Sequence, residues 1–148
     1  MSFNLLKYER ELYKNNITLI AGVDEAGRGP LVGPVVAAAV ILPKNYVLEG
    51  LNDSKQLSEK KREAFFKVLQ EEALSIGVGI VSAKVIDEIN ILEASRKAMY
   101  IALNNLDMTP EYILSDAVSL NDIDIPSRPI IHGDALSLSI AAASVIAK

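Results

Sequence analysis

The feature that most constrains this chain is an apolar run that stops at two acidic residues and a glycine-rich turn. Residues 17–21 (Ile-Thr-Leu-Ile-Ala) are typical of a buried strand, and residues 22–30 (Gly-Val-Asp-Glu-Ala-Gly-Arg-Gly-Pro) follow at once. A strand end would hold the acids in place, and the glycines would let backbone N–H groups approach a ligand closely. Arg28 adds a planar cation that can bind phosphate oxygens. This combination favours a site for metal ions and a phosphate backbone.

The composition excludes several kinds of site. The 148 residues are 50% hydrophobic and include one histidine and no cysteine. Disulfides and thiolate chemistry are therefore excluded, and oxygen atoms become the expected metal ligands in place of a histidine-based zinc site. The length predicts one domain with a substantial core. A net charge of −4 argues against a nucleic-acid-binding protein unless bound cations reverse the local sign.

The sequence carries no sign of secretion or membrane insertion. Residues 1–14 mix charged side chains with Leu5, Leu6 and Leu12, which predicts an amphipathic helix without the apolar core of a signal peptide. The longest apolar runs, near residues 35–42 and 140–147, are too short to span a bilayer. We therefore expect a soluble, cytoplasmic protein.

Hydrophobic periodicity predicts a sheet flanked by helices. Strands are expected over residues 17–24, 35–42, 74–82, 112–115 and 129–132. The short link between the first two strands suggests a hairpin. Helices are expected over residues 58–73, with Ser58 as the N-cap, over residues 92–106, and over the apolar residues 137–148. This alternation indicates the α/β class.

Three aspartates follow strand-like runs. Asp24, Asp116 and Asp134 would meet if those strands are neighbours in one sheet, because strand-end loops commonly form α/β sites. Glu25 can serve the same site as Asp24 only if the strand ends or bulges there. Carboxylates held so close need cations between them, and Mg²⁺ or Mn²⁺ suits oxygen ligands. Two such ions about 3.5–4 Å apart can activate a water and stabilise the leaving oxygen of a phosphodiester.

Each of these residues also has a structural explanation, which the local sequence leaves open. The Asp-Glu pair could polarise a turn, Asp116 could form an Asx-turn, and Asp134 could cap the last helix. Ser144 and Lys148 share one face of that helix, where they either let a phosphate approach or serve close packing and solvation. Lys55 could touch a nucleic-acid backbone or simply be solvated, and His132 is more simply a structural or exposed histidine than a proton shuttle.

Taken together, several segments resemble the ribonuclease HII family, also called type 2 ribonuclease H. The resemblance covers nearly the whole chain and lies in residues 22–30, 33–40, 51–55, 90–92, 133–134 and 139–148. It implies an α/β, RNase H-like fold, with a five-stranded mixed sheet flanked by helices. It also implies hydrolysis of RNA in RNA–DNA hybrids and at single ribonucleotides in duplex DNA, leaving 5′-phosphate and 3′-hydroxyl ends.

The resemblance also implies roles for particular residues. The catalytic, metal-binding acids, which would hold Mg²⁺ or Mn²⁺, are Asp24, Glu25, Asp116 and Asp134. The turn that senses the ribose 2′-hydroxyl, the group that separates RNA from DNA, corresponds to Gly27, Arg28 and Gly29. The remaining predicted substrate-binding residues are Lys55, Ser144 and Lys148. The expected partner is an RNA–DNA hybrid or ribonucleotide-containing duplex, bound by a monomer.

Three departures from the family pattern matter. Ala117 replaces a glycine that many members have after the third acid, and Leu136 stands where a lysine or arginine is frequent. The final apolar helix has no capping residue or helix breaker, so we expect residues 1–148 to be a single catalytic domain lacking its C-terminal helical part. An alternative function for such a chain is a non-catalytic hybrid-binding module, and a nuclease of related fold with another substrate is a third hypothesis.

Overall fold

The fold is built on one mixed β-sheet. The computed structural model describes residues 5–26, 33–48, 51 and 58–148. The strands are β1 (Ile20–Ala26), β2 (Val35–Ile41), β3 (Ser75–Val81), β4 (Tyr112–Asp116) and β5 (Ser127–Ile130). They form one five-stranded sheet in the order β3-β2-β1-β4-β5. The first three strands pair antiparallel, whereas β4 and β5 extend the sheet in parallel from β1. The predicted five-stranded mixed sheet is confirmed.

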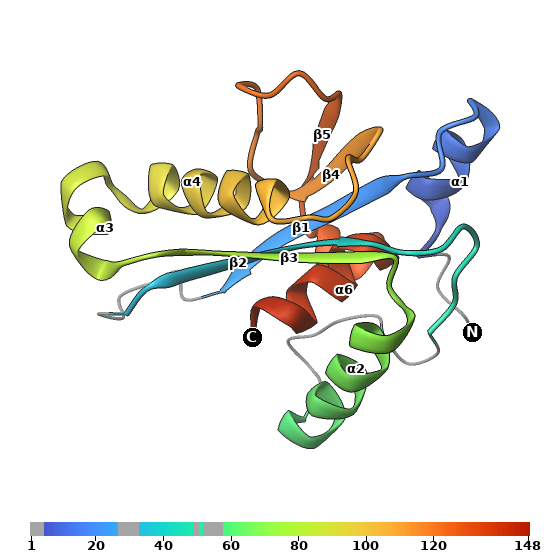
Figure 1. The fold of residues 1–148 in the computed structure, drawn as a ribbon, viewed down its shortest axis with the longest axis horizontal. Coiled ribbons are helices and arrows are strands. Elements are labelled where there is room, and N and C mark those ends of the chain that lie inside the picture. Colours follow the sequence, from blue (N-terminus) through green and yellow to red (C-terminus); the bar gives the residue numbers. More distant parts are fainter. Residues whose placement is uncertain (1–4, 27–32, 49–50, 52–57) are drawn as a thin grey trace.

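Helices cover both faces of this sheet (Figure 1). They are α1 (Lys7–Lys14), α2 (Glu59–Glu72), α3 (Ala83–Ile89), α4 (Ile91–Asn104), α5 (Gly133–Leu136) and α6 (Leu138–Ala147). In Figure 1, α4 lies on one side of the sheet, whereas α6 and α2 lie on the other. Ser58 caps α2 as predicted, because its hydroxyl accepts a hydrogen bond from the Lys61 N–H at 3.2 Å.

The central strands divide their side chains between two helical cores. On one face, Val23 of β1 packs in a buried cluster with Ala98 and Met99 of α4. On the other face, Ala38 of β2 packs in a cluster with Ala142 of α6. Both faces of these strands are therefore apolar, as expected for strands in the middle of a covered sheet.

α6 lies unusually close to β1. All ten residues of α6 are buried, which confirms the prediction of a buried helix. A Cβ atom on Gly22 would lie 2.1 Å from the backbone carbon of Ser139, so this approach requires glycine. Ser137 is the N-cap of α6, and its hydroxyl accepts a hydrogen bond from the Ile140 N–H at 3.3 Å.

The main differences from the predicted elements lie at turns. β5 ends at Ile130, two residues earlier than expected, because His132 adopts a left-handed φ of 58° that an extended strand does not allow. α3 is an addition to the predicted helices. Asn90, with a φ of 95°, separates it from α4 and caps α4 by accepting a hydrogen bond from the Glu93 N–H at 3.0 Å.

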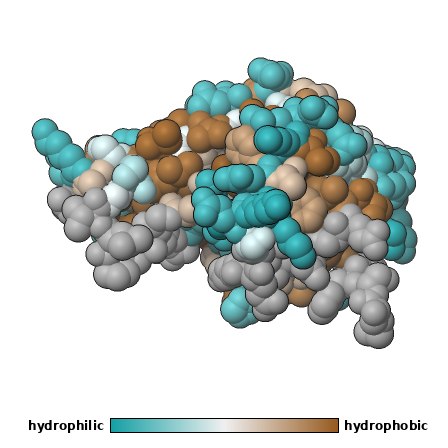
Figure 2. All heavy atoms as spheres, turned by 90° about the horizontal axis from the view of Figure 1, so that it is seen from below, coloured by the Kyte–Doolittle hydropathy of each residue, from teal (hydrophilic) through white to brown (hydrophobic). Residues whose placement is uncertain are grey.

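One edge of the sheet is less covered than its centre. Val78 and Ile80 of the edge strand β3 are exposed, in contrast to the buried apolar residues of β1 and β2. Seen from the side of α2, the surface shows apolar areas between hydrophilic side chains (Figure 2). Within the described ranges, no helix has both the length and the apolar character needed to cross a bilayer.

Candidate metal-binding site

Asp24 occupies a buried position near the C-terminal end of β1. It pairs with Ala38 of β2, and its side chain is only 4% exposed. One carboxylate oxygen, Oδ1, accepts a hydrogen bond from the Glu25 N–H at 2.8 Å. The two-residue period of a strand places Asp24 on the same face as Gly22, which is the face that α6 covers.

Asp116 reaches the same region because β4 runs parallel to β1. Parallel neighbours end at the same edge of a sheet, and Asp116 is the last residue of β4. Its Oδ1 accepts a hydrogen bond from the Gly133 N–H at 3.0 Å, which ties the end of β4 to the start of α5. Ala117, directly after it, adopts a left-handed φ of 64°, the conformation that suits the glycine expected here from the resemblance.

Asp134 comes from a short helix instead of a strand end. It lies in the first turn of α5 and is 3% exposed. Its predicted alternative role, as the cap of the last helix, is wrong because Ser137 caps α6. The left-handed turn at His132 separates β5 from α5, so Asp134 approaches the sheet edge from outside the strand.

These three aspartates form one cluster. Each offers a carboxylate oxygen, and the three oxygens lie within 4.8 Å of one another. Burial, together with the charges of Asp116 and Glu25, raises the pKa of Asp24 from its usual 3.8 to about 9. An oxygen-only set of mutually repelling carboxylates fits a hard divalent cation, which would relieve the repulsion.

Glu25 is a predicted site residue that lies outside the cluster of three aspartates. The pairing of β1 with β2 continues without a bulge through Ala26, so strand alternation directs the Cβ of Glu25 away from the face of Asp24. The Glu25 side chain does not belong to the group of three oxygens. Its charge nevertheless contributes to the raised pKa of Asp24, so it lies within electrostatic reach of the cluster.

The predicted substrate-binding residues are only partly described. Gly27, Arg28, Gly29 and Lys55 lie outside the described residues. Ser144 is buried in α6, and the Lys148 ammonium lies 3.3 Å from the Ser144 hydroxyl oxygen.

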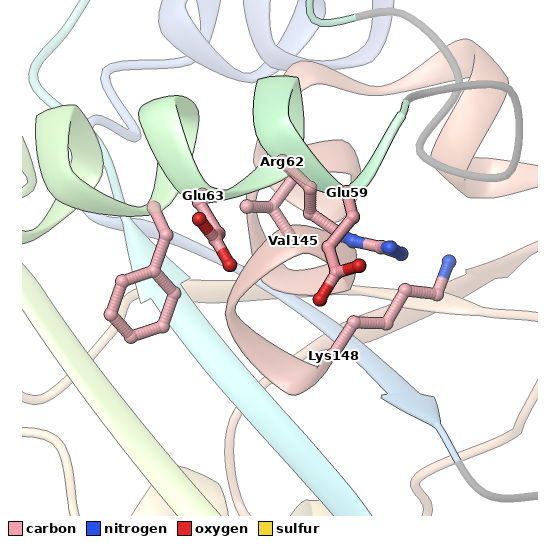
Figure 3. Close-up of a pocket in the computed structure, with 6 residues that line it drawn as sticks. Glu59, Arg62, Glu63, Val145 and Lys148 are labelled. Atoms are coloured by element: carbon pink, nitrogen blue, oxygen red, sulfur yellow. The ribbon is translucent and has the colours of Figure 1, made fainter.

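Lys148 also lines a pocket between α2 and α6 (Figure 3). The pocket places acidic and basic side chains together, and its lining residues are Glu59, Arg62, Glu63, Phe66, Val145 and Lys148. The 3.3 Å distance between their polar atoms shows that Ser144 and Lys148 are neighbours, as predicted from their spacing of four residues.

Sequence reasoning missed one buried acid. Glu9 of α1 is 1% exposed, and it accepts hydrogen bonds from the Ser137 hydroxyl and the Ser139 N–H. A signal was available, because Glu9 lies four residues after Leu5 and three before Leu12 and therefore falls on the apolar face of the predicted helix. A charge on such a face needs a buried partner.

Comparisons with known proteins agree with this architecture. The family model of ribonuclease HII matches residues 21–148. Ribonuclease HII from Acetivibrio thermocellus is 57% identical over 141 residues, which are 95% of this chain and 55% of that protein. Ribonuclease HII from Bacillus mycoides is 58% identical over 142 residues, 96% of this chain and 55% of that protein. The chain thus spans about half the length of these curated relatives.

A solved structure shares the fold. The crystal structure of the ribonuclease H2 from Pyrococcus horikoshii OT3 superposes with a TM-score of 0.75 at 30% sequence identity. The likeness covers 86% of this chain and 69% of that one. The RNase H-like fold expected from the sequence is therefore confirmed.

Proposed function

The chain belongs to the ribonuclease HII family, and we propose that it is the acid-bearing part of a metal-dependent endoribonuclease. The proposed substrates are the RNA strand of RNA–DNA hybrids and single ribonucleotides within duplex DNA. The proposed products carry 5′-phosphate and 3′-hydroxyl ends. The proposal includes action as a cytoplasmic monomer.

The convergence of Asp24, Asp116 and Asp134 is the observation that supports this function best. These residues come from β1, from the end of β4 and from α5, so the fold itself brings them together. Buried like charges at this separation destabilise the folded chain unless a proton or a cation compensates them. Their gathering therefore supports a metal-binding role over a structural one.

The proposed chemistry is hydrolysis of a phosphodiester. A pair of Mg²⁺ or Mn²⁺ ions held here would supply activation of the attacking water and stabilisation of the leaving oxygen. The P–O3′ bond breaks as water adds to phosphorus, and the 3′ oxygen leaves with a proton. Asp24, Asp116 and Asp134 would hold the ions, and Glu25 is the proposed fourth acid. Asp24 must lose its proton on metal binding because its pKa lies near 9 without metal.

Recognition of RNA is proposed for the segment after β1. The Gly27-Arg28-Gly29 turn would contact the ribose 2′-hydroxyl, the feature that distinguishes RNA from DNA at one nucleotide. Lys55 and Lys148 would contact the nucleic-acid backbone, with the buried Ser144 beside Lys148. Leu136, which is 40% exposed in α5 next to the acid site, offers no charge to a phosphate, so we expect weaker substrate binding than with a lysine there.

A cleavage assay on the full chain tests this proposal. The substrates are duplex DNA with one ribonucleotide, an RNA–DNA hybrid and the all-DNA duplex, each with Mg²⁺ or Mn²⁺. We expect cutting of the first two only and loss of cutting in Asp24→Asn. The exposed Asp122→Asn is the matched control and should retain activity.

Two results would contradict the proposal. One is equal cutting of the all-DNA duplex, which favours a related nuclease with another substrate. The other is salt-dependent hybrid binding without any product, which favours the non-catalytic binding module.

A further inference from the structure

Glu9 is a buried acid with no part in the proposed chemistry. It lies in α1, is 1% exposed, and uses a single oxygen, Oε2, for both of its hydrogen bonds. The Ser137 hydroxyl donates to this oxygen at 2.8 Å, and the Ser139 N–H donates to it at 3.0 Å. A buried carboxylate is costly to maintain, so its partners indicate what it holds in place.

The partners of Glu9 lie at the junction of α5 and α6. The neighbouring residue Leu138 donates its N–H to the Leu5 carbonyl at 2.8 Å, so three consecutive residues of this junction are bound to the N-terminal segment. Ser137 has a double role, because it ends α5 and also caps α6. Glu9 therefore contacts the chain at the point where one helix stops and the next begins.

A continuous set of hydrogen bonds leads from this junction to the acids. The Ser137 N–H donates to the Gly133 carbonyl at 2.8 Å, across the single turn of α5. The Gly133 N–H donates in turn to Asp116 Oδ1 at 3.0 Å. Asp134 is the next residue along the same turn. A shift of Ser137 would therefore move both Asp134 and the hydrogen bond that orients Asp116.

We propose that Glu9 is a positioning residue for the metal site, acting through Ser137 and the α5 turn on Asp134 and Asp116. The inference rests on the proposed metal-binding function of the three aspartates. Outer groups that orient metal ligands commonly affect metal affinity by about 10–100-fold when removed. Glu9 acts through two hydrogen bonds and one helical turn, so we expect the loss of metal affinity to lie near the lower limit of this range.

Metal titration of Glu9 variants of the full chain tests this role. Glu9→Ala leaves the Ser137 hydroxyl and the Ser139 N–H without their acceptor, and we expect about a tenfold weaker Mn²⁺ affinity by calorimetry. Glu9→Gln keeps an acceptor oxygen at the same place and should bind Mn²⁺ nearly as the wild type does. Glu11→Ala, an exposed acid of the same helix, is the matched control and should leave the affinity unchanged.

The outcomes separate this inference from the proposed function. Wild-type chain that binds no Mn²⁺ overturns both. Wild-type binding together with unchanged affinity in Glu9→Ala overturns the positioning role alone, even if the melting temperature falls. If Glu9→Ala does not fold, Ser137→Ala replaces it, since it removes the hydroxyl between Glu9 and α5. Unchanged Mn²⁺ affinity in folded Ser137→Ala overturns the inference, and a loss of affinity there supports it.

Discussion

The contact of α4 with β3 and the contact of α6 with β1 are built alike but differ in what each helix is connected to. On β3, a Cβ atom added to Gly79 would lie 2.2 Å from the Ala98 carbonyl oxygen of α4. On β1, a Cβ atom added to Gly22 would lie 2.1 Å from the Ser139 backbone carbon of α6. Both contacts therefore depend on glycine, and both bury a run of small residues.

The difference lies in what is attached to each helix. α4 contributes no residue to the acid cluster, and its Glu93 pairs with Arg96 at the surface. α6 follows directly after α5, which carries Asp134, and it packs on the strand that carries Asp24. We therefore expect the α6 contact to affect the spacing of the acids and the α4 contact to affect stability alone. Four predictions test this contrast, from the largest expected effect to the smallest.

Removing an acid on the α6 side should have the largest effect. Asp134→Asn removes one charge from the proposed metal site, and we expect more than about a hundredfold lower cleavage activity, a loss beyond that typical of outer groups around a metal. Glu93→Gln on α4 is the matched change and should retain activity within about twofold, as expected for an exposed ion pair. Steady-state cleavage rates at saturating Mn²⁺ measure both. Equal losses of cleavage activity in Asp134→Asn and Glu93→Gln would contradict the difference expected between the α6 and α4 sides.

The pH dependence of the free energy of unfolding should come mainly from Asp24, which lies on the sheet face that α6 covers. The pKa of Asp24 is raised from 3.8 to about 9, so its contribution to the free energy of unfolding is complete below pH 4 and is lost as the pH rises toward 9. Urea unfolding in EDTA should show falling stability over this range, with a slope of at most about 1.4 kcal/mol per pH unit from one group.

Two comparisons sharpen the pH experiment. Asp24→Asn should flatten the decline because the side chain no longer titrates. Added Mg²⁺ should stabilise the wild type most at high pH, since it binds the ionised acids. A decline of the same slope in wild type and Asp24→Asn would show that other groups cause it.

Alanine substitution at the two glycine contacts should show which contact affects Mn²⁺ binding in addition to the free energy of unfolding. Gly22→Ala and Gly79→Ala each force a methyl group onto backbone atoms, and each should cost about 1–3 kcal/mol or more in unfolding free energy. Only Gly22→Ala should also weaken Mn²⁺ binding, since it moves α6 away from β1. Chemical unfolding and calorimetry on the same samples measure the two effects. Weaker Mn²⁺ binding in Gly79→Ala would contradict the division of roles.

The smallest effect is expected at the turn after β4. Ala117 has a left-handed φ of 64°, and Ala117→Gly should raise the unfolding free energy by about 1 kcal/mol. Asn45, with a φ of 60°, is a control outside the site, and Asn45→Gly should change stability less because asparagine tolerates this conformation. Thermal unfolding measures both variants, and a loss of stability in Ala117→Gly would show that the methyl group packs usefully.

The sequence was sufficient for the sheet, and it predicted that the aspartates would meet if their strands were neighbours. β2 and β3 have the expected positions within one residue, because Val, Ile and Ala runs between turn residues have a strong local signature. Asp24 and Asp116 meet because they lie near the C-terminal ends of parallel neighbours, and the sequence suggested those ends.

Contacts between residues that are far apart in the chain could not be predicted from the sequence. The place of Asp134 in α5 depends on the left-handed turn at His132, a conformation that no local periodicity predicts. Glu9 stands on an apolar face, but its partner Ser137 is far away along the chain, and only folding identifies it. Two of the three departures have different outcomes, since Ala117 has the backbone conformation of a glycine and Leu136 is an exposed side chain.

The parallel pairing of β1 with β4 has a consequence for biosynthesis. Parallel strands need a crossover connection, and here β2, α2, β3, α3 and α4 all lie between them along the chain. Asp24 leaves the ribosome early, but it meets Asp116 and Asp134 only after that long excursion is complete. A growing polypeptide therefore cannot bring the three carboxylates together until Asp134 has emerged, and topologies dominated by such distant contacts fold more slowly.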